Sequence, residues 1–121
     1  MKVYIIHATS FNFKKGLYAP IEALKLNDIE FVFPHEYTNE AKNSKEMIKT
    51  CDVVIAEVSY PSTGSGIEMA WANYLDVPIF ALHHIDRQYS SSIKMLTNHI
   101  SSYADIAELQ KLIVQIIEKL K

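Results

Sequence analysis

The segment Asp52–Val58 (DVVIAEV) constrains the fold more than any other part of this 121-residue sequence. Its apolar residues follow one another without the alternation of a strand that has one solvated face. The segment therefore predicts a strand buried on both faces. Val3–Ile6 and Val77–Leu82 are two further apolar runs of strand length. Strands of this kind occur in parallel sheets that carry helices on both faces, which indicates an α/β fold.

Helical patterns and weaker strands lie between these three runs. Apolar residues at helical spacing predict a helix over Leu17–Leu24, in which Pro20 fits only the first turn or a kink. The other expected elements are a strand over Ile29–Phe33, a short helix opened by Asn43, Ser44 and Glu46, a helix marked by Ile67, Ala70, Trp71 and Tyr74, a helical turn over Ile93–Leu96, an edge strand over Ile100–Tyr103 and a helix from Ile106 to Leu120.

Strand and helix therefore alternate along the chain. This order predicts one domain over residues 1–121 with a doubly wound α/β fold, a mainly parallel sheet of about five strands and helices on both faces. The three apolar runs named above are expected as its central strands. Ligands of such sheets bind beyond the carboxyl ends of the strands. The loops Thr9–Lys15 and Ser59–Gly66, which follow the strongest strands, are therefore the expected places of function.

Charge and cysteine usage narrow the classes of partner. The formal net charge of −2 gives no electrostatic reason to expect a nucleic acid polymer or an anionic membrane. The N-terminal apolar run from Val3 to Ala8 is too short for the apolar core of a signal peptide and far too short for a membrane span. Cys51 is the one cysteine, and a chain that cannot form an internal disulfide suits a reducing compartment. We therefore expect a soluble, cytoplasmic protein.

The second loop has the composition of an anion site. Gly64 and Gly66 let the backbone approach a ligand closely, and Ser62 and Ser65 add hydroxyl groups. A helix is expected to start near Ser65 or Gly66. The free N–H groups and the dipole of a helix start favour an anion such as phosphate.

Glu68 follows this loop and has two interpretations. In the first turn of the helix the dipole favours its ionised form, which suits a nucleophile better than a general acid. Ser65-x-x-Glu68 also fits a capping box, in which the glutamate only returns a hydrogen bond to the helix start. The spacing alone favours the capping role.

The stretch Asp52–Ala72 resembles the nucleoside 2-deoxyribosyltransferase superfamily, and most closely its 2′-deoxynucleoside 5′-monophosphate N-glycosidase branch. The shared pattern is A-E-V-x-x-P-S-x-G-x-G-x-E, which here comprises Ala56, Glu57, Val58, Pro61, Ser62, Gly64, Gly66 and Glu68. Tyr4 lies in the first strand, where the family has its active-site tyrosine. Ser92–Met95 (SIKM) is similar to a family S-x-M segment that reaches into the site of a neighbouring subunit.

The resemblance implies a substrate, a mechanism and an assembly. Glu68 would attack C1′ of the sugar of a small nucleotide or nucleoside and form a covalent glycosyl-enzyme, which water hydrolyses with net retention. Tyr4 would position Glu68, and Ser62 would donate to the 5′-phosphate. A serine at this position favours a nucleotide, because the carboxylate of the nucleoside transferases would repel phosphate. The family also implies a homodimer, for which the Trp71–Tyr74 helix and Ser90–Met95 offer surface.

The sequence departs from the family pattern at two places. Ser44 occupies the position where the family has an aspartate that helps to protonate the departing base, and a serine cannot supply that proton at neutral pH. Either Ser44 is only a helix cap, or Glu46, Glu57 or His7 takes the acid role. His7 also begins a first loop that lacks the family's glycine-serine pair and arginine. A base-exchanging deoxyribosyltransferase and a nucleotide-binding relative without turnover are therefore the alternative functions.

No cofactor and no metal are expected. His83 and His84 are adjacent at the end of a strand, where neighbouring side chains point to opposite faces and cannot share one ion. Glu57, near the end of a buried strand, has two interpretations, as a residue of the substrate site or as the partner of a nearby lysine.

Overall fold

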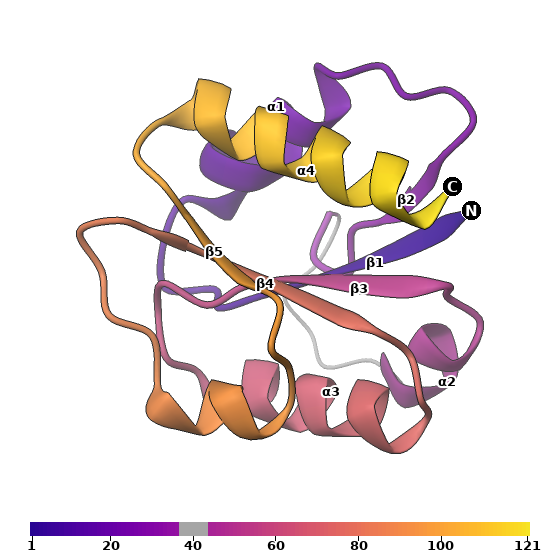
Figure 1. Cartoon of the computed structure of the whole chain (residues 1–121), viewed down its shortest axis with the longest axis vertical. Helices are drawn as coiled ribbons and strands as arrows, with labels where there is room; N and C mark the ends of the chain where they lie inside the picture. Colours follow the sequence, from indigo (N-terminus) through magenta and orange to yellow (C-terminus); the bar gives the residue numbers. More distant parts are fainter. Residues whose placement is uncertain (37–43) are drawn as a thin grey trace.

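The computed structural model describes residues 1–36 and 44–121, so Asn43, expected to open a helix, lies outside the described residues. Its centre is a parallel sheet of five strands in the order β2-β1-β3-β4-β5 (Figure 1). The strands are β1 (Lys2–His7), β2 (Glu30–Val32), β3 (Val53–Glu57), β4 (Ile79–His84) and β5 (Ile100–Tyr103). β1, β3 and β4 are central, which confirms the predicted fold class and the predicted central strands.

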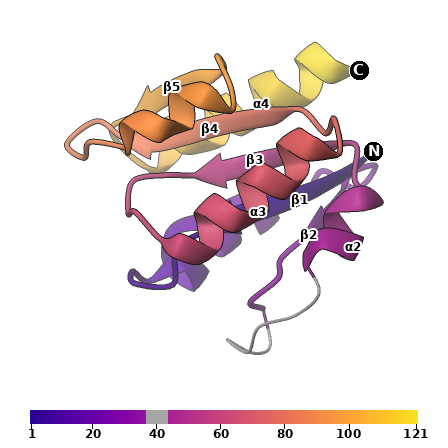
Figure 2. The same cartoon turned by 90° about the horizontal axis from the view of Figure 1, so that it is seen from below.

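Helices cover both faces of this sheet (Figures 1 and 2). One face, here called the α4 face, carries η1 (Lys14–Tyr18), α1 (Ala19–Glu22) and α4 (Ile106–Leu120). The other, the α3 face, carries α2 (Ser44–Lys49), α3 (Thr63–Tyr74) and η2 (Ser91–Met95). Strand residues alternate between the two: Val3 and Ile5 pack on the α4 face, whereas Tyr4 and Ile6 pack on the α3 face.

The start of α3 differs from the prediction. The helix begins at Thr63, and Ser62 is its N-cap with an extended backbone. The Ser62 Oγ atom accepts a hydrogen bond of 3.2 Å from the Ser65 N–H, so Ser65 lies inside the helix instead of opening it. The expected loop therefore ends at Ser62. Glu68 is the sixth residue of α3, in its second turn, and the predicted capping box with Ser65 does not form.

Smaller differences concern the ends of the other elements. β4 starts two residues later than expected and continues through His83 and His84. Pro20 lies in the first turn of α1, as predicted, directly after the π-helical turn η1. Among the described residues, no helix combines the length and the apolar character that crossing a membrane requires.

The carboxyl ends of β1 and β3 bring the two expected functional loops together. His7 at the end of β1 lies opposite Glu57 at the end of β3 in the parallel register. Beyond these ends, Phe11 of the first loop stacks on Tyr60 of the second, with 4.7 Å between the ring centroids. The two loops therefore meet at this edge of the sheet.

Candidate active site

The two predicted catalytic residues meet inside the protein. The Tyr4 hydroxyl donates a hydrogen bond of 2.6 Å to Oε2 of Glu68. Tyr4 is fully buried in β1, and Glu68 is 9% exposed on the inner side of α3. This contact confirms the expected geometry and excludes the alternative in which the carboxylate only caps its own helix. The contact itself does not assign the chemical role, which stays a prediction at this point.

The phenol of Tyr4 is held in its protonated form. Burial raises the pKa of Tyr4 well above its usual range, and the negative charge and hydrogen bond of Glu68 raise it further. The Ser44 side chain, at the start of α2, also hydrogen-bonds Tyr4 and lowers this pKa in part. Ser44 therefore contacts the tyrosine of the pair, and it is not merely the end of a helix.

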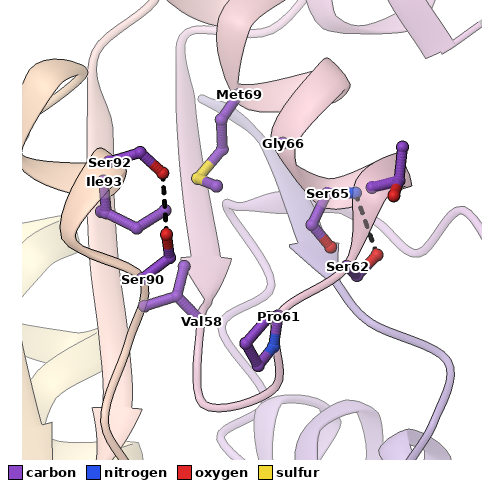
Figure 3. Close-up of a pocket in the computed structure, with 10 residues that line it drawn as sticks. Val58, Pro61, Ser62, Ser65, Gly66, Met69, Ser90, Ser92 and Ile93 are labelled. Atoms are coloured by element: carbon purple, nitrogen blue, oxygen red, sulfur yellow. Dashed lines mark hydrogen bonds between the residues drawn. The ribbon is translucent and has the colours of Figure 1, made fainter.

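A pocket of about 370 Å³ opens beside the start of α3 (Figure 3). Its wall on one side is the β3–α3 loop and the first turns of α3, and on the other side it is the segment around η2. The lining residues are Val58, Pro61, Ser62, Thr63, Ser65, Gly66, Met69, Ser90, Ser92 and Ile93. Four of the predicted site residues are in this set. They are Ser62, Ser65, Gly66 and Ser92.

The polar groups of this pocket retain hydrogen-bonding capacity. Ser62 Oγ accepts from the Ser65 N–H, which leaves the Ser62 proton available to a ligand. Ser65 Oγ is buried and has no hydrogen-bond partner among the described residues. A Cβ atom added at Gly66 would meet no atom within 4 Å, so the fold itself leaves space in front of this glycine. A buried hydroxyl without a partner is unfavourable, and a ligand atom in the pocket would satisfy it.

His7 has partners inside the protein. Its Nδ1 atom lies 2.7 Å from the Ala8 carbonyl and therefore carries the proton, so Nε2 accepts from the Tyr18 hydroxyl at 2.5 Å. The Tyr18 oxygen in turn accepts from the His35 N–H at 3.0 Å. Burial lowers the pKa of His7 to about 4, with the Ala8 carbonyl opposing this shift in part. His7 is therefore a neutral acceptor at neutral pH and does not suit the acid role.

Glu57 and Ser92 also form contacts within the chain. Glu57 is 2% exposed, and its carboxylate accepts from Ser59 and from the Tyr103 hydroxyl. The interpretation of Glu57 as the partner of a nearby lysine is not supported, since no ion pair among the described residues includes it. Ser92 Oγ lies 2.8 Å from Ser90 Oγ. Direct contact of His7, Glu57 or Gly64 with substrate stays a prediction.

The structure describes no group of three or more histidine, cysteine, aspartate or glutamate residues, within residues 1–36 and 44–121, that could hold a metal ion. Ile67, Tyr74 and Met95 are large apolar residues with exposures of 47%, 79% and 83%. They lie on α3 and η2, where the homodimer surface is expected, and the homodimer stays a prediction.

Comparison with known proteins identifies related enzymes. No family model matches the chain. Over 51 residues it is 39% identical to a Syntrophotalea carbinolica protein named "Putative 2'-deoxynucleoside 5'-phosphate N-hydrolase 1", which covers 42% of this chain and 36% of the relative. A protein of the same name from Methanosarcina mazei is 34% identical over 79 residues, which is 61% of this chain and 48% of the relative.

Solved structures extend the similarity over nearly the whole chain. The CMP N-glycosidase BcmB of Clostridium botulinum superimposes with a TM-score of 0.69 at 25% identity, covering 93% of this chain and 98% of that one. A 2-deoxyribosyltransferase of Bacillus psychrosaccharolyticus has the same fold, with a TM-score of 0.57, 19% identity and coverage of 91% and 90%. By sequence and by fold the chain is therefore similar to members of the nucleoside 2-deoxyribosyltransferase superfamily. It spans about half or less of the length of the curated relatives it matches.

The sequence does not reveal the roles of two tyrosines, Tyr18 and Tyr103, which form buried polar contacts. Tyr18 bonds to His7, and burial raises its pKa well above the usual range, while the His35 N–H lowers it and Glu36 and Glu68 raise it. Tyr103 bonds to Glu57 from β5. A tyrosine within an otherwise apolar stretch is a weak sequence signal of a buried polar contact, because its ring alone also suits a core.

The pKa of His7 predicts a pH-dependent stability. An unfolded histidine binds its proton near pH 6.5, whereas folded His7 does so near pH 4. The unfolded chain therefore takes up more protons in this window, and the unfolding free energy should fall as the pH is lowered from 6.5 towards 4. The slope contributed by His7 is at most about 1.4 kcal/mol per pH unit.

Urea unfolding of the wild type and of His7→Gln at several pH values between 7 and 4 measures this contribution. The variant should lose that part of the slope, and the exposed His99→Gln should keep it. Equal slopes in His7→Gln and the wild type would show that His7 has an ordinary pKa in the folded protein.

Proposed function

We propose that this protein is an N-glycosidase that hydrolyses a nucleoside 5′-monophosphate and uses Glu68 as its nucleophile. The observation that carries the proposal is the Tyr4–Glu68 hydrogen bond of 2.6 Å, next to a pocket lined by hydroxyl groups and a helix start. Related proteins named as deoxynucleoside 5′-phosphate N-hydrolases and a CMP N-glycosidase support the same bond as the target. The chain matches less than half of the length of these curated relatives, so the proposal names a class of substrate, the nucleoside 5′-monophosphates.

The reaction has two displacements at C1′ of the sugar. In the first, a Glu68 oxygen forms a bond to C1′, the N-glycosidic bond breaks, and its electron pair leaves with the base, which takes up a proton. In the second, water attacks C1′ and gives up a proton to the solvent, the bond to Glu68 breaks, and the sugar phosphate departs as the carboxylate is regenerated. Each displacement inverts C1′, so the net outcome is retention.

Tyr4 controls the nucleophile in this scheme. Its protonated hydroxyl donates to one carboxylate oxygen, Oε2, and this orients the other oxygen towards the sugar. When C1′ is esterified the carboxylate loses its charge, and the same hydroxyl favours the return of that charge in the second step. The Ser44 side chain, at the start of α2, interacts with the same hydroxyl and helps to hold Tyr4 in place.

The phosphate is assigned to the pocket at the start of α3. The free N–H groups of the first turn, the Ser62 proton and the buried Ser65 hydroxyl are donors directed to one anion. The described lining residues include no lysine or arginine, so the hydroxyl groups and the helix dipole would carry the binding. Ser65 and Glu68 are three positions apart on one face of α3, so a phosphate bound at Ser65 would lie on the same side of the helix as the proposed nucleophile.

Glu68→Gln tests the nucleophile. The amide retains the shape and a hydrogen-bonding oxygen for Tyr4, so we expect a melting temperature within a few degrees of the wild type. Loss of the nucleophilic charge should lower base release about a thousandfold or more. The assay first screens ribo- and deoxyribonucleoside 5′-monophosphates with the wild type, with and without an acceptor base, since only a transferase yields a new nucleoside.

The exposed Glu22→Gln on α1 is the matched control and should retain wild-type activity. Near-native turnover in Glu68→Gln, on a substrate that the wild type hydrolyses, would refute the proposed nucleophile.

Ser62→Asp tests the phosphate site without loss of the helix cap, because aspartate caps a helix as well as serine does. A second negative charge near the phosphate costs about 3 kcal/mol at an intermediate dielectric, which corresponds to roughly a hundredfold rise in KM. Ser62→Asn, a neutral cap of the same size, should raise KM far less. Hydrolysis of the matching nucleoside should be little affected in both variants. Equal effects on nucleotide and nucleoside would remove phosphate recognition from this loop.

A further inference from the structure

Glu57 is a buried carboxylate outside the Tyr4–Glu68 pair. It ends β3 on the α4 face and is 2% exposed. One oxygen accepts from the Ser59 N–H at 2.6 Å, and the other accepts from Ser59 Oγ at 2.8 Å and from the Tyr103 hydroxyl. Among the described residues none of the ion pairs includes it. Burial of a carboxylate without a cation is unfavourable unless hydrogen-bond donors compensate its charge. Loss of one of these donors should therefore destabilise this arrangement.

Two of the three donors to Glu57 belong to Ser59, in the loop between β3 and α3. Both the N–H and the hydroxyl of Ser59 are bound, and Ser59 is 1% exposed. Ser59 Oγ also accepts from the His84 N–H of β4 at 2.7 Å. Ser59, the second residue after β3, is therefore hydrogen-bonded to β3 and to β4. Through Glu57 it is also connected to Tyr103 of β5. The loop from Ser59 to Ser62 has little freedom at this end.

Tyr60, the next residue, packs against side chains from outside the loop. The Tyr60 ring stacks on Phe11, and the guanidinium carbon of Arg87 lies 4.3 Å from the centroid of the same ring. Tyr60 therefore lies between an aromatic ring and a cation, with the Glu57 contacts immediately before it. Two residues after Tyr60, Ser62 caps α3 and lines the pocket. The position of Ser62 thus follows from the contacts of Ser59 and Tyr60.

We propose that Glu57 is a positioning residue, which holds the Ser59–Ser62 loop so that Ser62 and the first N–H groups of α3 are directed at the substrate phosphate. Tyr103 keeps the Glu57 carboxylate in the orientation that binds Ser59. The proposal rests on the proposed function for the phosphate, and it adds a contact on the face of the sheet opposite to α3. A purely structural carboxylate would change the stability of the protein and leave the KM of the folded enzyme unchanged.

Tyr103→Phe and Glu57→Gln test the proposal at different strengths. Tyr103→Phe removes one donor to Glu57 and changes no residue that lines the pocket at the start of α3, while Glu57→Gln removes the charge and keeps the shape. Loss of a charge-assisted hydrogen bond corresponds to about a tenfold change. We therefore expect KM for the nucleoside 5′-monophosphate to rise about tenfold or more in each folded variant, with kcat and nucleoside hydrolysis changed less than about threefold. Glu22→Gln is the matched control.

A double-mutant cycle locates the effect. If Glu57 acts through the loop, Tyr103→Phe should raise KM much less in a Ser62→Ala background than in the wild type, because the two residues then act on one contact. Full additivity, or an equal loss for nucleotide and nucleoside, would overturn the proposal.

Amide hydrogen exchange supplies a readout that needs no turnover and separates this proposal from the proposed function. In Tyr103→Phe the Ser59 and Ser65 amides, which donate to Glu57 and to Ser62 Oγ, should exchange about tenfold faster, while those in the middle of α4 keep their wild-type rates. Unchanged exchange in the loop would overturn the positioning role, whatever the enzyme hydrolyses. Faster loop exchange in a protein whose wild type releases no base would instead reject the proposed function.

Discussion

The hydrogen bond between the Tyr4 hydroxyl and the Glu68 carboxylate connects the centre of the sheet to the helix that follows the next strand. Both groups are buried, and each needs the other, since a phenol or a carboxylate without a partner is unfavourable in the interior. β1 is paired with β3 in parallel, and α3 returns over the face on which Tyr4 points. The contact is thus a consequence of strand order and side-chain alternation.

The residue at which α3 begins is the second constraint on the site. Because Ser62 caps the helix, Ser65 and Glu68 lie on its inner side, one turn apart. A start two residues later would not change the spacing of these residues, but it would remove the cap hydrogen bond and the first turn of N–H groups from the pocket. The proposed phosphate and the proposed nucleophile therefore depend on one short loop. That loop is held on the α4 face by Glu57 and on the outside by Phe11 and Arg87.

Much of this organisation could be predicted from local patterns. The apolar run Asp52–Val58 indicated a central strand, and the family-like pattern that follows it singled out Glu68 with Tyr4 as its partner. The start of α3 was wrong because Ser62 and Ser65 are both good caps, and only the backbone geometry distinguishes them. The pairs His7–Tyr18 and Glu57–Tyr103 are 11 and 46 positions apart. Such side-chain pairs depend on three-dimensional proximity, about which the spacing of residues in one sequence carries no information.

The stereochemistry at C1′ tests the covalent role of Glu68 most directly. Methanol competes with water for a glycosyl-enzyme and gives a methyl glycoside phosphate whose anomeric configuration does not interconvert, so proton NMR can assign it. Hydrolysis of a β-configured nucleoside 5′-monophosphate in the presence of methanol should give the β-methyl glycoside, because two inversions restore the configuration. Formation of the α-methyl glycoside would show a single displacement by the solvent nucleophile, and it would contradict a glycosyl intermediate on Glu68.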